Sequence, residues 1–135
     1  MNLIKRSLQI SLAAAGLVFI SSGCAKVEGP GGSSSIVGKI HVEVRDVAGN
    51  LINEFDAQNE DVFLLYGEDD TFHDDDVKTS YDGTFAFEYL QKGSYTLYVY
   101  QECPTCASGE EPIFVDVEIT DSKSTVDVGT IIIQQ

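Results

Sequence analysis

Six carboxylates crowd the ten residues from Gly67 to Asp76. They are Glu68, Asp69, Asp70, Asp74, Asp75 and Asp76. Hard oxygen ligands at this density are the kind that Ca²⁺ prefers. The spacing lacks the glycine that follows the acidic run of an EF-hand loop, and unpaired carboxylates repel one another unless solvent or a cation screens them. Two interpretations therefore stay open, a solvated acidic loop and a weak Ca²⁺ site.

Cys103 and Cys106 form a C-x-x-C motif. In a thioredoxin-like protein this motif opens a helix, whose dipole lowers the pKa of the first thiol. Here a loop over residues 107–112 follows and leads into a predicted strand. No further cysteine or suitably spaced histidine completes a four-ligand zinc site. We predict a disulfide that stiffens the loop, with an exchangeable dithiol and a metal site as alternatives.

Tyr98 and Tyr100 alternate with Leu97 and Val99, so they are predicted to point away from the core. Tyrosines on an outer sheet face stack on sugars, pack on a partner, or pack on one another across strands. His41 alternates with apolar residues in the same way and is also predicted to point outward. Nothing in the spacing suggests a base held in place by a third group, as a catalytic triad requires. We therefore predict that the protein is not an enzyme.

The N-terminus carries Lys5 and Arg6, then an apolar stretch over residues 8–20, and then Ser-Ser-Gly before Cys24. The apolar stretch fits the roughly 7–15 residues of a signal-peptide core and is shorter than the about 20 residues of a membrane span. The pattern resembles a bacterial lipobox. This resemblance implies removal of residues 1–23 and attachment of lipid, including palmitate, to Cys24. A plain secretory signal with an incidental cysteine is the alternative.

The residues after Cys24 indicate the location and the domain boundary. Ala25 follows, not Asp, which by resemblance to sorting in Gram-negative bacteria favours the outer membrane. Residues 25–35 are rich in Gly and Ser and have no apolar period, so residues 24–35 are predicted to form a lipidated, flexible tether that lets the domain stand clear of the headgroups. Residues 36–135 are long enough for one domain with its own core.

The mature part is strongly acidic. It holds all 22 acidic residues and six basic ones, a net charge of about −16. Nucleic-acid binding needs the opposite sign and is excluded, and anionic lipid surfaces repel such a domain. The charge is compatible with solubility, bound cations or basic partners.

From Ile36 the apolar residues follow a period of two, and no helical period occurs in the mature part. The turn signal Asp82–Gly83 predicts a hairpin on either side of it. The expected strands cover residues 36–45, 61–66, 77–80, 84–88, 95–100, 113–119 and 126–133. The pattern predicts an all-β fold, a single seven-stranded antiparallel β-sandwich.

Residues 81–99 contain Asp-Gly, Phe-x-Phe and Leu-x-x-Gly-x-Tyr-x-Leu-x-Val. This segment resembles the carboxypeptidase regulatory-like domain, an Ig-like or transthyretin-like sandwich close to the Cna-B type, and residues 126–131 resemble its last strand. Phe85 and Phe87 are expected to fill the core. Tyr95 stands at a strand start, where its hydroxyl is expected to reach back to the backbone as in a tyrosine corner.

The resemblance implies an accessory, spacer or binding module. We therefore predict an envelope lipoprotein, anchored through Cys24, whose sandwich is a protein-interaction module for an envelope partner. One alternative is a small ligand-binding module that uses Tyr98 and Tyr100 for glycan or the acidic loop for Ca²⁺. Another is a thiol-redox lipoprotein that uses Cys103 and Cys106.

Overall fold

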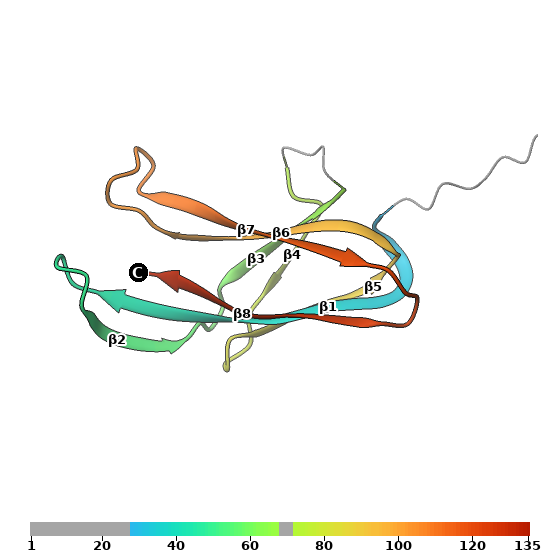
Figure 1. The fold of residues 1–135 in the computed structure, drawn as a ribbon, viewed down its shortest axis with the longest axis horizontal. Helices are drawn as coiled ribbons and strands as arrows, with labels where there is room; N and C mark the ends of the chain where they lie inside the picture. Colours follow the sequence, from blue (N-terminus) through green and yellow to red (C-terminus); the bar gives the residue numbers. More distant parts are fainter. Residues whose placement is uncertain (1–27, 68–71) are drawn as a thin grey trace, which may run out of the picture.

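The described residues form eight strands in two sheets, shown in Figure 1 for a computed structural model of the chain. The structure describes residues 28–67 and 72–135, so the predicted signal peptide and Cys24 lie outside the described residues. The strands are β1 (Pro30–Arg45), β2 (Leu51–Asp56), β3 (Asp61–Tyr66), β4 (Asp75–Lys78), β5 (Thr84–Leu90), β6 (Gly93–Glu102), β7 (Glu110–Ile119) and β8 (Thr125–Gln134).

Strand β1 is the centre of the first sheet. Its first part pairs with β5 and its last part with β2, both antiparallel, while β8 runs parallel to it along the other edge. The second sheet has the order β4-β3-β6-β7 and is antiparallel throughout. The predicted all-β sandwich is confirmed, with β2 as an additional strand and with one parallel pair.

The core lies between the two sheets and uses the inward residues of nearly every strand. Phe85 and Phe87 are 5% and 1% exposed, as the sequence predicted. Each fully buried side chain of this size contributes about 1.5–3 kcal/mol. The other members include Ile36, Ile40, Val42, Val62, Leu64, Leu90, Leu97, Val99, Val117, Ile119, Ile131 and Ile133.

Strand β2 is missing from the prediction because it has no buried face. Leu51, Ile52 and Phe55 are all more than 40% exposed, so the strand shows no alternation of buried and exposed residues. Its position is set by a tight turn, in which Asp46 Oδ1 accepts the backbone N–H groups of Ala48 and Asn50 at 2.9 and 2.8 Å.

The hairpin predicted at Asp82–Gly83 is wrong. Strands β4 and β5 belong to different sheets, and the turn carries the chain from one sheet to the other. Ser80 N donates to Thr84 O at 2.8 Å, which closes the turn without starting a ladder. Gly83 has φ +79°, and a Cβ there would lie 2.4 Å from Ile40 O, so the turn packs too closely on β1 for another residue.

The predicted tether is shorter than expected, because β1 begins at Pro30 and takes up residues 30–35. Ser34 is buried, and its Oγ donates to Asp121 O at 2.9 Å. A Cβ on Gly32 would lie 1.9 Å from Leu90 O. The small residues of this segment therefore allow a close approach of β1 to its neighbours, and their composition does not make the segment flexible.

Tyr95 forms the predicted tyrosine corner. Its side chain is 1% exposed, and its hydroxyl donates to Gln91 O at 2.7 Å. The same hydroxyl accepts the backbone N–H of Gly29 at 3.0 Å. The corner thus joins the turn before β6 to the residues that lead into β1.

Replacing Tyr95 with Phe leaves the buried N–H of Gly29 and the partly buried carbonyl of Gln91 without this partner. We expect Tyr95→Phe to lower the free energy of unfolding by about 1–2 kcal/mol. Urea denaturation should show a lower midpoint with an unchanged m-value. Tyr89→Phe is the matched control, because the Tyr89 side chain is 70% exposed. Equal midpoints for Tyr95→Phe and wild type would contradict the role of the corner.

The outer face of β1 carries polar contacts to β2. His41 Nδ1 lies 3.0 Å from Asp56 Oδ1, and His41 Nε2 lies 3.4 Å from Glu54 Oε2. The bond to Asp56 has the largest effect and raises the pKa of His41; burial opposes it, and the weaker bond to Glu54 adds to the rise. His41 therefore points outward, as predicted, and acts as a contact between strands.

A raised pKa makes this histidine a pH-dependent support for β2. Its contribution is fully present below the unfolded-state pKa of about 6.5 and is lost as the pH rises through the higher folded-state value. We expect His41→Gln to lower the thermal midpoint at pH 5.5 and to leave it unchanged at pH 8.5. A loss of the same size at both pH values would mean that the protonated form has no special role.

Candidate functional site: an outward aromatic face

Three aromatic rings stand in one row across the outer face of the second sheet. Phe63 of β3 is paired with Tyr98 of β6, and Tyr98 is paired with Phe114 of β7. Leu64 and Leu97, next to Phe63 and Tyr98, are fully buried, and Ile113 and Val115, next to Phe114, are half-buried against the core. Because successive side chains of a strand point to opposite faces, burial of these neighbours turns the three rings toward solvent.

Tyr98 is the centre of this group. Its ring stacks on Phe63 with centroids 4.9 Å apart and an interplanar angle of 18°, and it meets Tyr100 edge to face at 5.7 Å and 89°. Phe114 packs on its other side at 5.7 Å. His73 Nδ1 lies 3.4 Å from the Tyr98 hydroxyl. We call Phe63, His73, Tyr98, Tyr100 and Phe114 the aromatic face.

The exposure of these rings is uneven. Phe114 is 60% and Tyr100 is 41% exposed, whereas Phe63 and Tyr98 are half-buried by their neighbours. Burial, with a smaller effect of Tyr100, raises the pKa of the Tyr98 hydroxyl, so it remains a neutral hydrogen-bonding group.

The predicted outward position of Tyr98 and Tyr100 is confirmed, and the structure adds three rings that sequence reasoning missed. Phe114 has the same outward alternation, but only the register places it beside Tyr98.

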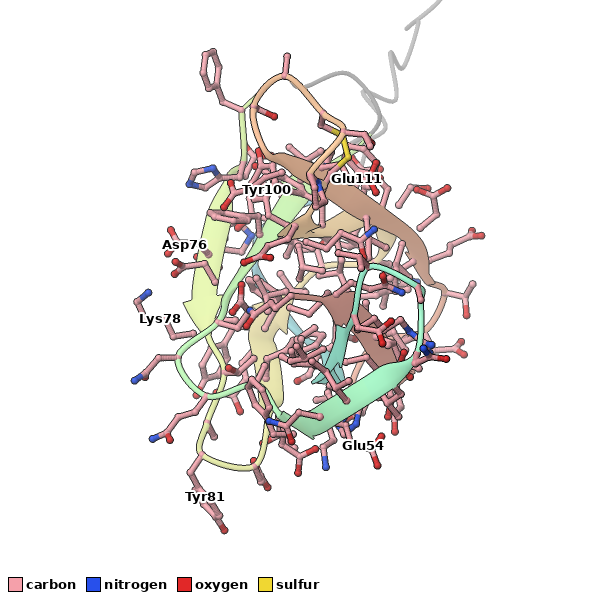
Figure 2. The ribbon with its side chains drawn as sticks, turned by 90° about the vertical axis from the view of Figure 1, so that its left-hand side faces the viewer. Glu54, Asp76, Lys78, Tyr81, Tyr100 and Glu111 are labelled. Carbon is pink, nitrogen blue, oxygen red and sulfur yellow. A yellow bond between two sulfur atoms is a disulfide. The ribbon has the colours of Figure 1, made fainter. Side chains whose placement is uncertain are left out.

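Polar side chains border the aromatic face. Asp76 of β4 is paired with Phe63, and Thr96 Oγ1 donates to Asp116 Oδ1 at 3.1 Å on the other side. Lys78 Nζ lies 2.6 Å from Asp61 Oδ1, so this cation is neutralised within the sheet. Figure 2 shows Asp76, Lys78 and Tyr100 on the same side of the molecule. The described residues around the aromatic face therefore offer several hydrogen-bond acceptors, and the lysine among them is already paired with a carboxylate.

Three of the six carboxylates of the acidic loop, those of Asp74, Asp75 and Asp76, belong to the described residues. Glu68, Asp69 and Asp70 lie outside the described residues. Asp74 Oδ2 accepts the backbone N–H of Tyr66 at 2.7 Å, which ties the loop to the end of β3. Asp75 and Asp76 are successive residues of β4 and so point to opposite faces. These three carboxylates do not converge on one point, and the Ca²⁺ site stays a prediction.

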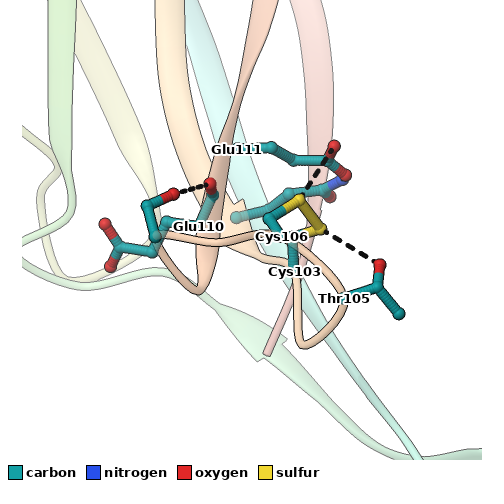
Figure 3. Close-up of a disulfide and its surroundings, with 7 residues drawn as sticks. Cys103, Thr105, Cys106, Glu110 and Glu111 are labelled. Atoms are coloured by element: carbon teal, nitrogen blue, oxygen red, sulfur yellow. Dashed lines mark hydrogen bonds between the residues drawn. A yellow bond between two sulfur atoms is a disulfide. The ribbon is translucent and has the colours of Figure 1, made fainter.

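Cys103 and Cys106 form a disulfide, as predicted, in the loop between β6 and β7 (Figure 3). Cys103 N donates to Gly109 O at 2.8 Å, which closes the loop above the sheet. Glu111 Oε2 lies 3.9 Å from Cys106 Sγ, and among the described residues only these three side chains group as metal ligands would. The bonded sulfurs are not thiolates, and a neighbouring carboxylate disfavours thiolate formation after reduction. The geometry favours a structural role over metal binding or redox exchange.

No model of a known protein family matches the chain, and no curated protein matches it. Among solved structures, the chain is similar to a crystal structure of a "putative carbohydrate binding protein" from Pseudomonas aeruginosa. The two share 12% identity with a TM-score of 0.48, over 79% of this chain and 91% of the other. Across the two described ranges, no helix has the length and apolar character needed to span a membrane.

Proposed function

We propose that the chain is a non-enzymatic, lipid-anchored binding module of the bacterial envelope, and that it binds glycans on its aromatic face. The observation that carries this proposal is the row of rings in register across β3, β6 and β7. The C–H face of a sugar ring is apolar and packs on an aromatic ring, whose burial is favourable. A row of three rings at about 4.8 Å strand spacing offers a platform about 10 Å long, which suits an oligosaccharide.

The border of the face supports recognition of hydroxyl groups. The carboxylates of Asp76 and Asp116 flank the row and accept hydrogen bonds from donors such as sugar hydroxyls or ammonium groups. A mature charge of about −16 repels anionic ligands. The expected ligand is therefore a neutral or amino-sugar glycan, and glycans with carboxylate or phosphate groups are disfavoured.

A protein-interaction module is the second candidate, and strand β2 is the observation that favours it. Its outer edge is unpaired within the described residues, and Leu51, Ile52 and Phe55 are exposed along it. Exposed edges add a strand from a partner. Glu54, whose side chain is 58% exposed, favours a partner strand with basic side chains, whereas Asp56 is already paired with Lys39 and His41.

The exposed rings give the sharpest test of glycan binding. We expect Tyr100→Ala and Phe114→Ala each to weaken the glycan found on a glycan array by about 1–1.5 kcal/mol, roughly tenfold in Kd by titration calorimetry. Tyr81→Ala is the matched control, because Tyr81 is 80% exposed and lies in the turn between the sheets.

Thermal midpoints of all three variants should stay near that of wild type, since the mutated rings are exposed. The glycan proposal fails if the control weakens binding as much as the two face variants, or if no neutral or amino-sugar glycan binds. Capture of a basic strand peptide that is lost in Phe55→Lys, with no glycan bound, would support the second candidate instead.

The anchor is tested separately, and it rests on the resemblance of Ser-Ser-Gly-Cys24 to a lipobox. We expect Cys24→Ala to move the protein from the membrane fraction to the soluble fraction, because one thioether-linked diacylglycerol contributes about 0.8 kcal/mol per buried CH₂ group. Immunoblots of fractionated cells provide the measurement. A variant that stays with the membrane would place the anchor elsewhere.

A further inference from the structure

The folded domain begins very close to the predicted lipid. Gly29 O accepts the backbone N–H of Gln91 at 2.9 Å, and Gly29 N donates to the Tyr95 hydroxyl. Only Ala25, Lys26 and Val27 separate Cys24 from Glu28, the first described residue. Even when fully extended, this connection spans at most about 14 Å. The surface around residues 28–33 therefore cannot lie far from the attached lipid.

Two turns share this end of the sandwich. Gln91 Nε2 donates to Pro30 O at 2.9 Å, and Lys123 N donates to Ser33 Oγ at 3.1 Å. We call residues 28–33, 91–92 and 120–124 the anchor end. In Figure 1 these segments lie at the right, and the β6–β7 loop with its disulfide and the β1–β2 turn lie at the left. Strands of ten residues place the two ends about 30 Å apart.

The anchor end differs in charge from the rest of the domain. Its ionisable side chains are Glu28, Lys92, Asp121 and Lys123, so it is balanced while the domain as a whole is strongly acidic. The salt bridges of the described residues engage the other basic side chains, Lys39, Arg45 and Lys78, but not Lys92 or Lys123.

A small polar hollow opens on the same end. It has a volume of about 180 Å³, and its lining includes Ser33, Gln91, Lys92 and Ser122. A lysine beside hydroxyl groups suits a phosphate group. Phosphate groups lie in the headgroup layer of a phospholipid surface, so the hollow, the two lysines without salt bridges among the described residues and the short connection point to the same partner.

We propose that the anchor end rests on the headgroup layer of the membrane that holds the lipid on Cys24. Lys92 and Lys123 face headgroup phosphates, the aromatic face runs up the side of the domain, and the disulfide loop points away from the membrane. This inference rests on the lipid anchor of the proposed function. It replaces the expectation of a domain that stands clear of the headgroups.

Position-specific quenching tests this orientation. The lipidated mature chain is reconstituted into phosphatidylcholine vesicles with a fraction of phosphatidylglycerol and with a nitroxide quencher on the headgroups. Cys103 and Cys106 are bonded to each other and Cys24 is alkylated, so an engineered cysteine alone takes a thiol-reactive fluorophore. Ser122→Cys marks the anchor end and Val47→Cys, at a fully exposed site, marks the opposite end.

We expect quenching at position 122 to exceed that at position 47 at least threefold. Inserting twelve Gly and Ser residues between Ala25 and Lys26 creates a long tether and should remove most of the difference in quenching between positions 122 and 47. Equal quenching at both positions in the uninserted chain would overturn the orientation. An insertion that leaves the difference intact would instead support direct adhesion of the anchor end.

Two further experiments test the lipid anchor and the lysine contacts separately. Vesicle flotation of wild type and Cys24→Ala reports on the anchor alone, so a floating Cys24→Ala chain would remove the basis of both proposals. A floating wild type with equal quenching would overturn only the orientation. Lys92→Glu combined with Lys123→Glu should halve the quenching at position 122, and unchanged quenching would refute the contact with headgroup phosphates.

Discussion

The pairing of β1 on both of its edges is the constraint on which the rest of the structure depends. This strand of 16 residues holds β8 along one edge and β5 and β2 along the other, so the first sheet exists only around it. Its first residues pair less regularly than its middle, with Pro30 and Ser34 both opposite Leu90, but the hydrogen bond from Ser34 to Asp121 still fixes them to the fold. The same pairing therefore sets both the size of the sheet and the point at which the chain leaves the fold.

The second sheet depends on the first through the shared core. Leu64, Leu97 and Val99 are fully buried in the core that they share with residues of the first sheet, which fixes the face that each strand turns to solvent. A shift of one residue in register would bury Tyr98 and expose Leu97. The aromatic face is thus a by-product of core packing, held on a rigid sheet where rings keep fixed positions and lose little entropy on binding a ligand.

The sequence predicted what local alternation and turn chemistry can encode, and the tertiary contacts decided the rest. Period-two alternation located seven strands, and the position of Tyr95 at a strand start predicted its corner. Strand β2 was not predicted because all its apolar residues are exposed. The hairpin at Asp82–Gly83 was wrong because this turn has the same local sequence signal whether the strands on either side of it pair or belong to different sheets. Residues 30–35 have the composition of a flexible linker. The need for a glycine at position 32 becomes visible only in the structure, where the segment lies close to Leu90. The row of rings needs the register of three strands, which no single segment contains.

The acidic charge and the short connection act together in the proposed arrangement. In the proposed mature chain, a charge of about −16 is repelled by an anionic surface, and a long tether would let the domain move outward in response. A connection of at most about 14 Å leaves little room for that movement. Electrostatic repulsion of the acidic domain then turns the domain instead of moving it away from the membrane. In that arrangement the balanced anchor end faces the lipid, and β7 begins with Glu110 and Glu111 beside the disulfide loop, at the opposite end of the sandwich. In the proposed arrangement the aromatic face follows the strands along the side of the domain, so neither the membrane nor the disulfide loop would cover it, and a long glycan would have access from the side.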